Sequence, residues 1–248
     1  MRESRYQIGL NIAILLISSL LIFSGREAHA QTTPGRTSSH VKGESSEPLW
    51  QFGGFFAAGF VPSYEVHYGV VRYGVELNLF NEGFEIGRMV TGIHGPRVLR
   101  GRGEAILEVI PFWLANYPRQ TQYVYSSDFP NRAPLPFHWG PYQRYGASVT
   151  PALFRWNFEH DEGHRFQPWA QLGGGLLWTN HKFPLLGGST SVINFTPQVD
   201  IGENIFVSKR RSLEFAMKFV HISNAGLGDH NPGLNITLQF SVGYSWWK

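Results

Sequence analysis

The sequence has 248 residues, a formal net charge of +3 and no cysteine, so disulfides, cysteine nucleophiles and cysteine metal sites are excluded. The charge is small and no Lys/Arg stripe with interleaved aromatic residues occurs, which argues against a nucleic-acid partner. Charged residues make up 16% of the chain, aromatic residues 15%, and 28 residues are glycine, a composition that suits a β-barrel facing lipid.

The first 30 residues are predicted to be a cleaved signal peptide. Arg2 and Arg5 precede an apolar run over residues 12–23, and the small residues Ala28 and Ala30 flank the end of the segment. This run is shorter than the roughly 20 residues that a spanning helix needs, and no later segment reaches that length. A helical membrane protein is therefore excluded.

After a polar, flexible leader predicted over residues 31–48, the chain alternates apolar and polar residues with period two and shows no helical period. The alternation is clearest near the end of the chain, where one face is wholly apolar and the other is small and polar. Residues 49–60 are either a ninth segment or the true first strand. The predicted strands cover residues 68–79, 84–91, 99–113, 145–157, 166–179, 193–207, 213–223 and 237–246.

These patterns predict an all-β domain over residues 49–248, an eight-stranded antiparallel transmembrane β-barrel of outer-membrane type. The signal segment, the even strand count and the aromatic strand ends favour this fold over a soluble two-sheet sandwich, which would also alternate. An eight-stranded barrel has room inside only for side chains, so mixed charges on the inner faces indicate a filled interior rather than a channel. The charges predicted to face inward are Arg100, Arg102, Glu104, Glu108, Asp200 and Lys218.

The orientation follows if both ends of the barrel lie on the periplasmic side and the long loops lie outside. The connections 117–144, 180–190 and 224–232 are then extracellular. The basic run Lys209-Arg210-Arg211 falls at a periplasmic turn, where its default role is solvation and where it cannot contact lipid A phosphates.

His221 and Ser223 continue the apolar, lipid-facing parity of the strand over residues 213–223 at its extracellular end. Ionisable and polar groups at such positions are candidate functional residues. Residues two apart on a strand share a face, and an imidazole within hydrogen-bond reach of a Ser hydroxyl can take its proton. By itself His-x-Ser is a weak signal, equally explained by a strand end that meets polar headgroups.

The surrounding sequence strengthens the signal. His221-Ile222-Ser223-Asn224-Ala225-Gly226, followed by Asn231-Pro232-Gly233-Leu234-Asn235 and a closing strand, resembles the signature of the lipid A 3-O-deacylase family. The resemblance implies an outer-membrane enzyme that hydrolyses the 3-position acyl ester of lipid A. It also implies His221 as general base, Ser223 as nucleophile, and Asn224 with Gly226 as oxyanion donors.

Asn235 departs from that family pattern, because it stands where the family places a glutamate that orients the histidine. An amide can orient an imidazole but cannot neutralise an imidazolium, and Asp229 in the same loop is an alternative partner. The departure favours a second hypothesis, in which the chain is a non-catalytic structural or adhesive outer-membrane barrel.

No metal or other cofactor is predicted. His160 and His164 lie four residues apart among carboxylates, but they link two strands and lack the Glu directly after the first His that zinc proteases of the His-Glu-x-x-His type require. The expected partner is lipid A of lipopolysaccharide, met in the outer membrane.

Overall fold

The computed structural model describes residues 50–68, 71–124, 133, 135–159, 165–184, 191–227 and 234–248. The predicted signal peptide and leader, residues 1–48, lie outside them, as do His160 and His164. Within the described residues, no helix is long and apolar enough to cross a bilayer.

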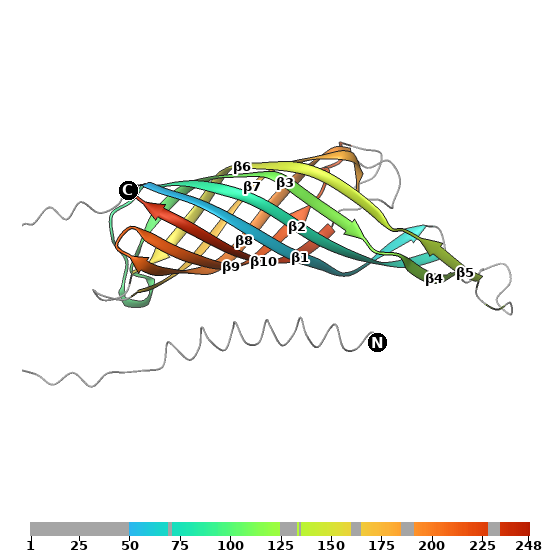
Figure 1. The fold of residues 1–248 in the computed structure, drawn as a ribbon, viewed down its shortest axis with the longest axis horizontal. Helices are drawn as coiled ribbons and strands as arrows, with labels where there is room; N and C mark the ends of the chain where they lie inside the picture. The colour runs from blue at the N-terminus through green and yellow to red at the C-terminus, as the bar shows by residue number, and fades with distance from the viewer. Residues whose placement is uncertain are drawn as a thin grey trace, which may run out of the picture. The chain divides into compact units, whose positions relative to one another are not determined.

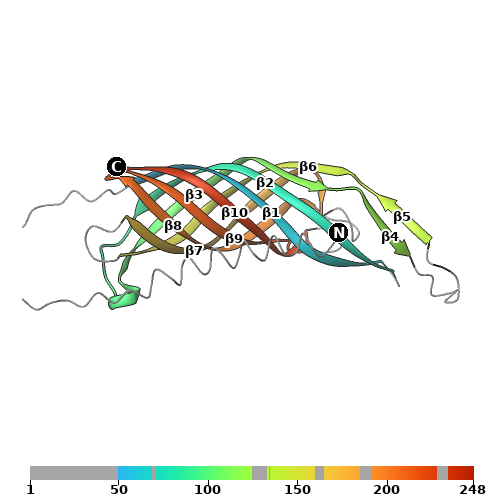
Figure 2. The same ribbon diagram turned by 60° about the horizontal axis from the view of Figure 1, so that its bottom comes forward.

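Eight antiparallel strands close into a barrel in which β10 pairs with β1 (Figure 1, Figure 2). This confirms the predicted fold class. Two short strands form a separate hairpin between β3 and β6, and a 3-10 turn covers Arg97–Leu99. The barrel strands are β1 (Trp50–Tyr68), β2 (Val71–Met89), β3 (Gly101–Tyr117), β6 (Tyr142–Phe158), β7 (Phe166–Phe183), β8 (Ser191–Ser208), β9 (Arg211–Ile222) and β10 (Leu234–Trp247), and the hairpin strands are β4 (Gln120–Val124) and β5 (Leu135–Trp139).

The first strands differ from the prediction. Residues 68–79 and 84–91 were predicted as separate strands, but residues 71–89 form the single strand β2, and β1 is the true first strand. Asn81, Glu82 and Gly83 have the composition of a turn. In the barrel, however, Asn81 points into the lumen and its Nδ2 donates to Gln239 Oε1 at 2.6 Å. This hydrogen bond across the lumen and the continuous pairing of residues 81–83 with β1 therefore override the local turn preference.

Burial alternates along β3 as expected, with Glu104 and Glu108 facing the lumen and Leu107 facing outward. Two predicted positions are wrong. Trp113 shares the parity of Leu107 in the predicted strand over residues 99–113 and was therefore expected on the outer face. It lies inside because the pairing with β6 shifts register between Ile110 and Trp113. Arg100, placed inside, precedes β3 and is exposed outside the barrel.

The half of the lumen nearer Trp50 and Lys248, which is the periplasmic half by the general rule for outer-membrane barrels, holds a buried charged network centred on Arg155, which is 0% exposed. Its guanidinium donates to Glu85 at 2.7 Å, to Glu214 at 3.0 Å and to Gln171 at 2.7 Å. The same group lies 4.0 Å from the ring centroid of Trp169. Because a buried charge is costly unless it is paired, these contacts join four strands into one unit.

The network continues towards the extracellular side through Lys218, which pairs with Glu108, and through Asp200, which accepts from Gln171 at 2.6 Å and from Gln198 at 3.3 Å. Beyond it the lumen is mostly apolar, although Thr179, Asn194 and Thr196 are also buried there. Its buried side chains there include Leu77, Leu79, Trp113, Ala115, Tyr117, Leu177, Phe183, Val220 and Ile222. The lumen is thus filled by side chains along its length, with the charged network at one end and the main apolar cluster at the other.

Candidate active site

The end of β9 presents the predicted pair on the outer wall. Leu213 and Phe215 face lipid, whereas Glu214 and Val220 are buried in the lumen, so the parity carries His221 outward, where it is half-buried. Ile222, the next residue, is 1% exposed and packs in the apolar layer of the lumen. The inward anchor fixes the outward direction of its neighbours.

Pro197 interrupts the sheet beside His221. The pairing Gln198↔Val220 and the bridge Phe195↔Ser223 share one register, which brings Pro197 of β8 opposite His221. Proline has no backbone N–H, so the hydrogen bond that residue 197 would donate to β9 is missing. The regular ladder of β8 and β9 accordingly stops at Val220.

A β-bulge lies on the other side of His221. Leu234 pairs with Ile222 and Thr237 with Val220, so Asn235 and Ile236 together stand opposite His221. Bulges of this kind bend a strand and re-aim side chains, and they are frequent next to active sites. The backbone register thus brings residues 235 and 236 opposite His221.

Ser223 follows β9 and is held by two backbone hydrogen bonds to Phe195. The N–H of Ser223 donates to the Phe195 carbonyl at 3.1 Å, and the N–H of Phe195 donates to the Ser223 carbonyl at 2.6 Å. Partners that exchange both bonds point their side chains to the same face of the sheet. Phe195 is exposed on the outer wall, so Ser223 belongs to the same face as His221, although Ser223 itself is only 8% exposed.

Asn224 opens a tight turn that includes Gly226. The N–H of Leu227 donates to the Asn224 carbonyl at 2.9 Å, and φ is +49° at Ala225 and +84° at Gly226. Positive φ at both central residues is the pattern of a type I′ turn, which glycine adopts without strain. The Gly226 N–H donates to Asn224 Oδ1 at 3.0 Å, so it is already engaged. Asp229 lies outside the described residues.

The family model for lipid A 3-O-deacylase (PagL) matches residues 114–245, which is more than half of the chain. The chain belongs to this family. Its membership, together with the barrel, makes the protein an outer-membrane β-barrel and supports a lipid A deacylase-like function, with lipid A of lipopolysaccharide as the substrate.

Solved structures similar to this PagL-family chain include the outer membrane enzyme PagL, at 14% identity and a TM-score of 0.40, covering 77% of this chain and 97% of that one. OprG from Pseudomonas aeruginosa is similar at 12% identity and a TM-score of 0.47, covering 82% and 96%. The Neisserial surface protein A gives 13% identity and a TM-score of 0.37, covering 79% and 96%. Comparison with curated proteins gave no significant match.

Sequence reasoning on this PagL-family chain missed Pro197, although its signal was present. A proline in the middle of an otherwise alternating segment indicates an interruption of the ladder. The residue opposite that interruption could not be named without the register. Among the described residues, no group of three or more His, Asp and Glu side chains is arranged to hold a metal ion.

Proposed function

We propose that this barrel hydrolyses the 3-position acyl ester of lipid A in the outer leaflet, with Ser223 as nucleophile and His221 as general base. The observation that carries the proposal is that His221, near the end of β9, and Ser223, just beyond it and 8% exposed, share the outward face of the sheet. A lipid that stays in its leaflet can meet such a site directly, and polar residues on a lipid-facing wall are candidate functional groups.

The chemistry follows the general pattern of acyl transfer by an activated hydroxyl. Ser223 Oγ attacks the ester carbonyl carbon while His221 accepts the hydroxyl proton. The proton then passes to the departing sugar oxygen, which leaves the acyl group on Ser223. Water then attacks the acyl-enzyme while His221 again accepts a proton. His221 returns this proton to Ser223 Oγ, which releases the fatty acid and regenerates the Ser223 hydroxyl.

Asn224 and Gly226 have unequal roles in the proposal. In known hydrolases, a donor aimed at the developing oxyanion lowers the activation free energy of the reaction by about 2.7–4 kcal/mol. The Gly226 N–H is bonded to Asn224 Oδ1, and this bond fixes the direction of the amide. We therefore assign the oxyanion contact first to Asn224 Nδ2, with Gly226 as its support.

Asn235 is the proposed orienting residue for His221, and the bulge opposite His221 supports this assignment. An amide can hold an imidazole in one tautomer through a hydrogen bond. It offers no negative charge to the imidazolium that forms when His221 takes the proton. The proposal therefore predicts a hydrolase that is slower than one with a carboxylate at this position.

The acyl chain has an apolar surface to lie on beside Ser223. Ile193, Phe195, Ile236 and Leu227 are all exposed on the outer wall or in the adjoining turn. Because lipid tails are themselves apolar, this surface provides shape rather than a hydrophobic driving force. The proposed cleavage at the 3-position is inferred from the family alone.

The test is mass spectrometry of lipid A from a Gram-negative host that lacks such an activity and expresses the parent chain, Ser223→Ala or His221→Asn. We expect loss of one 3-hydroxyacyl chain with the parent only. Ser208→Ala, at the periplasmic end of β8, is the matched control and should behave as the parent. Folding is checked by heat-dependent migration in gels, and intact lipid A with a folded parent chain would contradict the proposal.

Asn235 favours one alternative, a non-catalytic structural or adhesive barrel of the same family and fold. In that case lipid A stays intact with every variant. The Ser223→Ala and His221→Asn substitutions then change neither lipid A nor the amount of folded barrel.

A further inference from the structure

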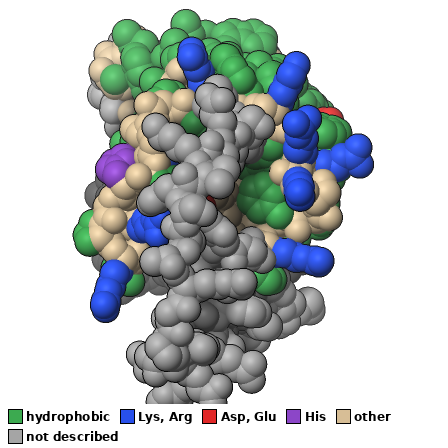
Figure 3. All heavy atoms as spheres, turned by 90° about the vertical axis from the view of Figure 1, so that its left-hand side faces the viewer, with side chains coloured by type: hydrophobic (Ala, Val, Ile, Leu, Met, Phe, Trp, Pro, Cys, Tyr) green, Lys and Arg blue, Asp and Glu red, His purple; other side chains and the backbone are tan. Residues whose placement is uncertain are grey.

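The periplasmic end of the barrel is strongly basic. Figure 3, which looks onto that end, shows Lys and Arg side chains spread around it with very little acidic surface. Among the described residues at this end, two acidic side chains are not fully buried: Glu159, which is paired with Arg102 at 2.8 Å, and Glu203, which is half-buried on β8. The basic residues are Arg88, Arg97, Arg100, Arg102, Arg165, Lys209, Arg210, Arg211 and Lys248.

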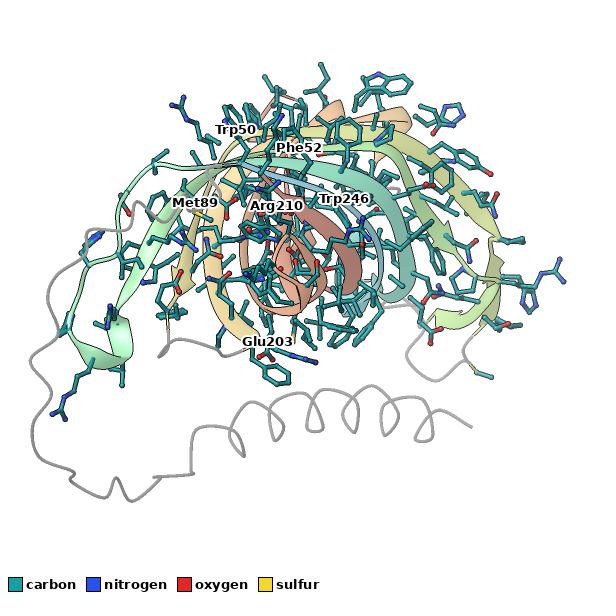
Figure 4. All side chains as sticks on the ribbon, turned by 60° about the vertical axis from the view of Figure 1, so that its left-hand side comes forward. Trp50, Phe52, Met89, Glu203, Arg210 and Trp246 are labelled. Atoms are coloured by element: carbon teal, nitrogen blue, oxygen red, sulfur yellow. The ribbon has the colours of Figure 1, made fainter. Side chains whose placement is uncertain are left out.

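Two of these cations lie on the lipid-facing wall beside exposed indoles. The Arg88 guanidinium lies 5.3 Å from the ring centroid of Trp50, and Arg211 stands opposite Trp246 across β9 and β10. Phe52 is the direct partner of Trp246 across the β1–β10 seam. We call these five residues the seam surface. Trp50, Phe52 and Trp246 are exposed by 40%, 42% and 52%, and Figure 4 shows Trp50 and Phe52 together at one edge of the barrel.

We propose that the seam surface binds the anionic headgroup of a phospholipid in the periplasmic leaflet. Exposed tryptophans at barrel ends mark the level of the membrane interface, so Arg88 and Arg211 lie at headgroup depth. A guanidinium binds a phosphate through two parallel hydrogen bonds. The acyl chains continue onto the apolar wall formed by Phe56 and Val242. These two exposed residues pair with each other four residues along β1 and β10 from Phe52 and Trp246.

The charge balance selects an anionic lipid over a zwitterionic one. The seam surface carries two cations and no acid, and the neighbouring turn adds Lys209 and Arg210. A zwitterionic headgroup brings an ammonium that these cations repel, whereas phosphatidylglycerol brings net negative charge. The position on the outer wall, rather than at the lumen mouth, favours a lipid over a soluble anionic partner.

The experiment is native mass spectrometry of the folded full chain, released from nanodiscs that contain equal amounts of phosphatidylglycerol and phosphatidylethanolamine with the same acyl chains. We expect the parent chain to retain phosphatidylglycerol several-fold more often. Arg88→Gln combined with Arg211→Gln should lower this retention about tenfold. The control, Arg97→Gln combined with Arg165→Gln, removes the same charge from exposed positions at the same end but away from the indoles.

Equal retention of the two lipids by the parent chain would overturn the proposal. So would an equal loss in the control, since it would indicate a diffuse charge effect without a site. If the Arg88/Arg211 variant does not fold, the proposal is still tested by comparing the lipid preference of the parent with that of the control variant. None of these readouts depends on ester hydrolysis, so they are independent of the proposed function.

Discussion

Pro197 of β8 stands opposite His221 of β9, so the residue beside the proposed base cannot donate a ladder hydrogen bond. On the other side, the bulge at Asn235 and Ile236 also breaks the regular pairing. His221 is thus flanked by two irregularities in an otherwise closed sheet. Each can be removed or altered by a single substitution.

Pro197→Ala restores a backbone donor opposite His221. We expect deacylation to fall about tenfold or more, because small displacements of a reacting group are costly. The free energy of unfolding should stay unchanged or rise by about 1 kcal/mol through the added hydrogen bond. Initial rates on purified lipid A and urea unfolding in lipid vesicles measure the two effects. Pro168→Ala, at the periplasmic end of β7, is the control and should leave the rate unchanged.

Asn235→Glu places a carboxylate opposite His221. We expect the rate of deacylation to rise about tenfold or more, since a carboxylate both orients an imidazole and stabilises the imidazolium. Asn78→Glu adds the same charge to the exposed face of β2 and should have no effect on the rate. A decrease in the Asn235→Glu variant that remains folded would show that this position does not support His221.

Asn224→Asp tests the role of Asn224 Nδ2 separately from that of Oδ1. The carboxylate keeps an acceptor for the Gly226 N–H but loses the Nδ2 donor. If Nδ2 contacts the oxyanion, kcat should drop by about 10²–10³, as strongly as in Asn224→Ala, with little change in KM. Asn180→Ala is the matched amide control at the extracellular end of β7. Activity retained in Asn224→Asp would assign the oxyanion to other donors.

Arg155→Met removes the cation from the buried network and leaves Glu85 and Glu214 without their partner. Breaking a buried ion pair from one side costs about 3–5 kcal/mol, and we expect that loss in the free energy of unfolding. Arg144→Met, on β6 near the extracellular end, should change stability by no more than about 0.5 kcal/mol. Both variants should remain active at temperatures where the barrel is folded.

The sequence alone predicted the barrel, its strand number and the outward parity of His221, because strict alternation over long segments reports directly which residues share a face. It misplaced Trp113, since a register shift in β3 reverses the parity and has no simple composition signal. It also divided β2 at Asn81, whose partner Gln239 is distant in sequence. Both errors arose from long-range pairing.

Some features of the candidate site could be predicted from the sequence and others could not. His221 and Ser223 could be selected from their spacing on one strand, and Asn224 and Gly226 from the adjoining motif. The register of residue 235 opposite His221 depends on a bulge between β9 and β10, and the bond between Gly226 and Asn224 depends on the turn conformation. Neither follows from periodicity, which describes one strand at a time.

The filled lumen separates two sets of evolutionary constraints. Side chains that hold the barrel together point inward, where the network around Arg155 and the apolar layer around Ile222 leave little freedom for substitution. Residues on the outer wall touch mainly lipid and can be exchanged among apolar types at small cost. Outward substitutions on β8 and β10 can therefore change which lipid chains such a barrel contacts. The inward-facing side chains that stabilise the fold stay unchanged.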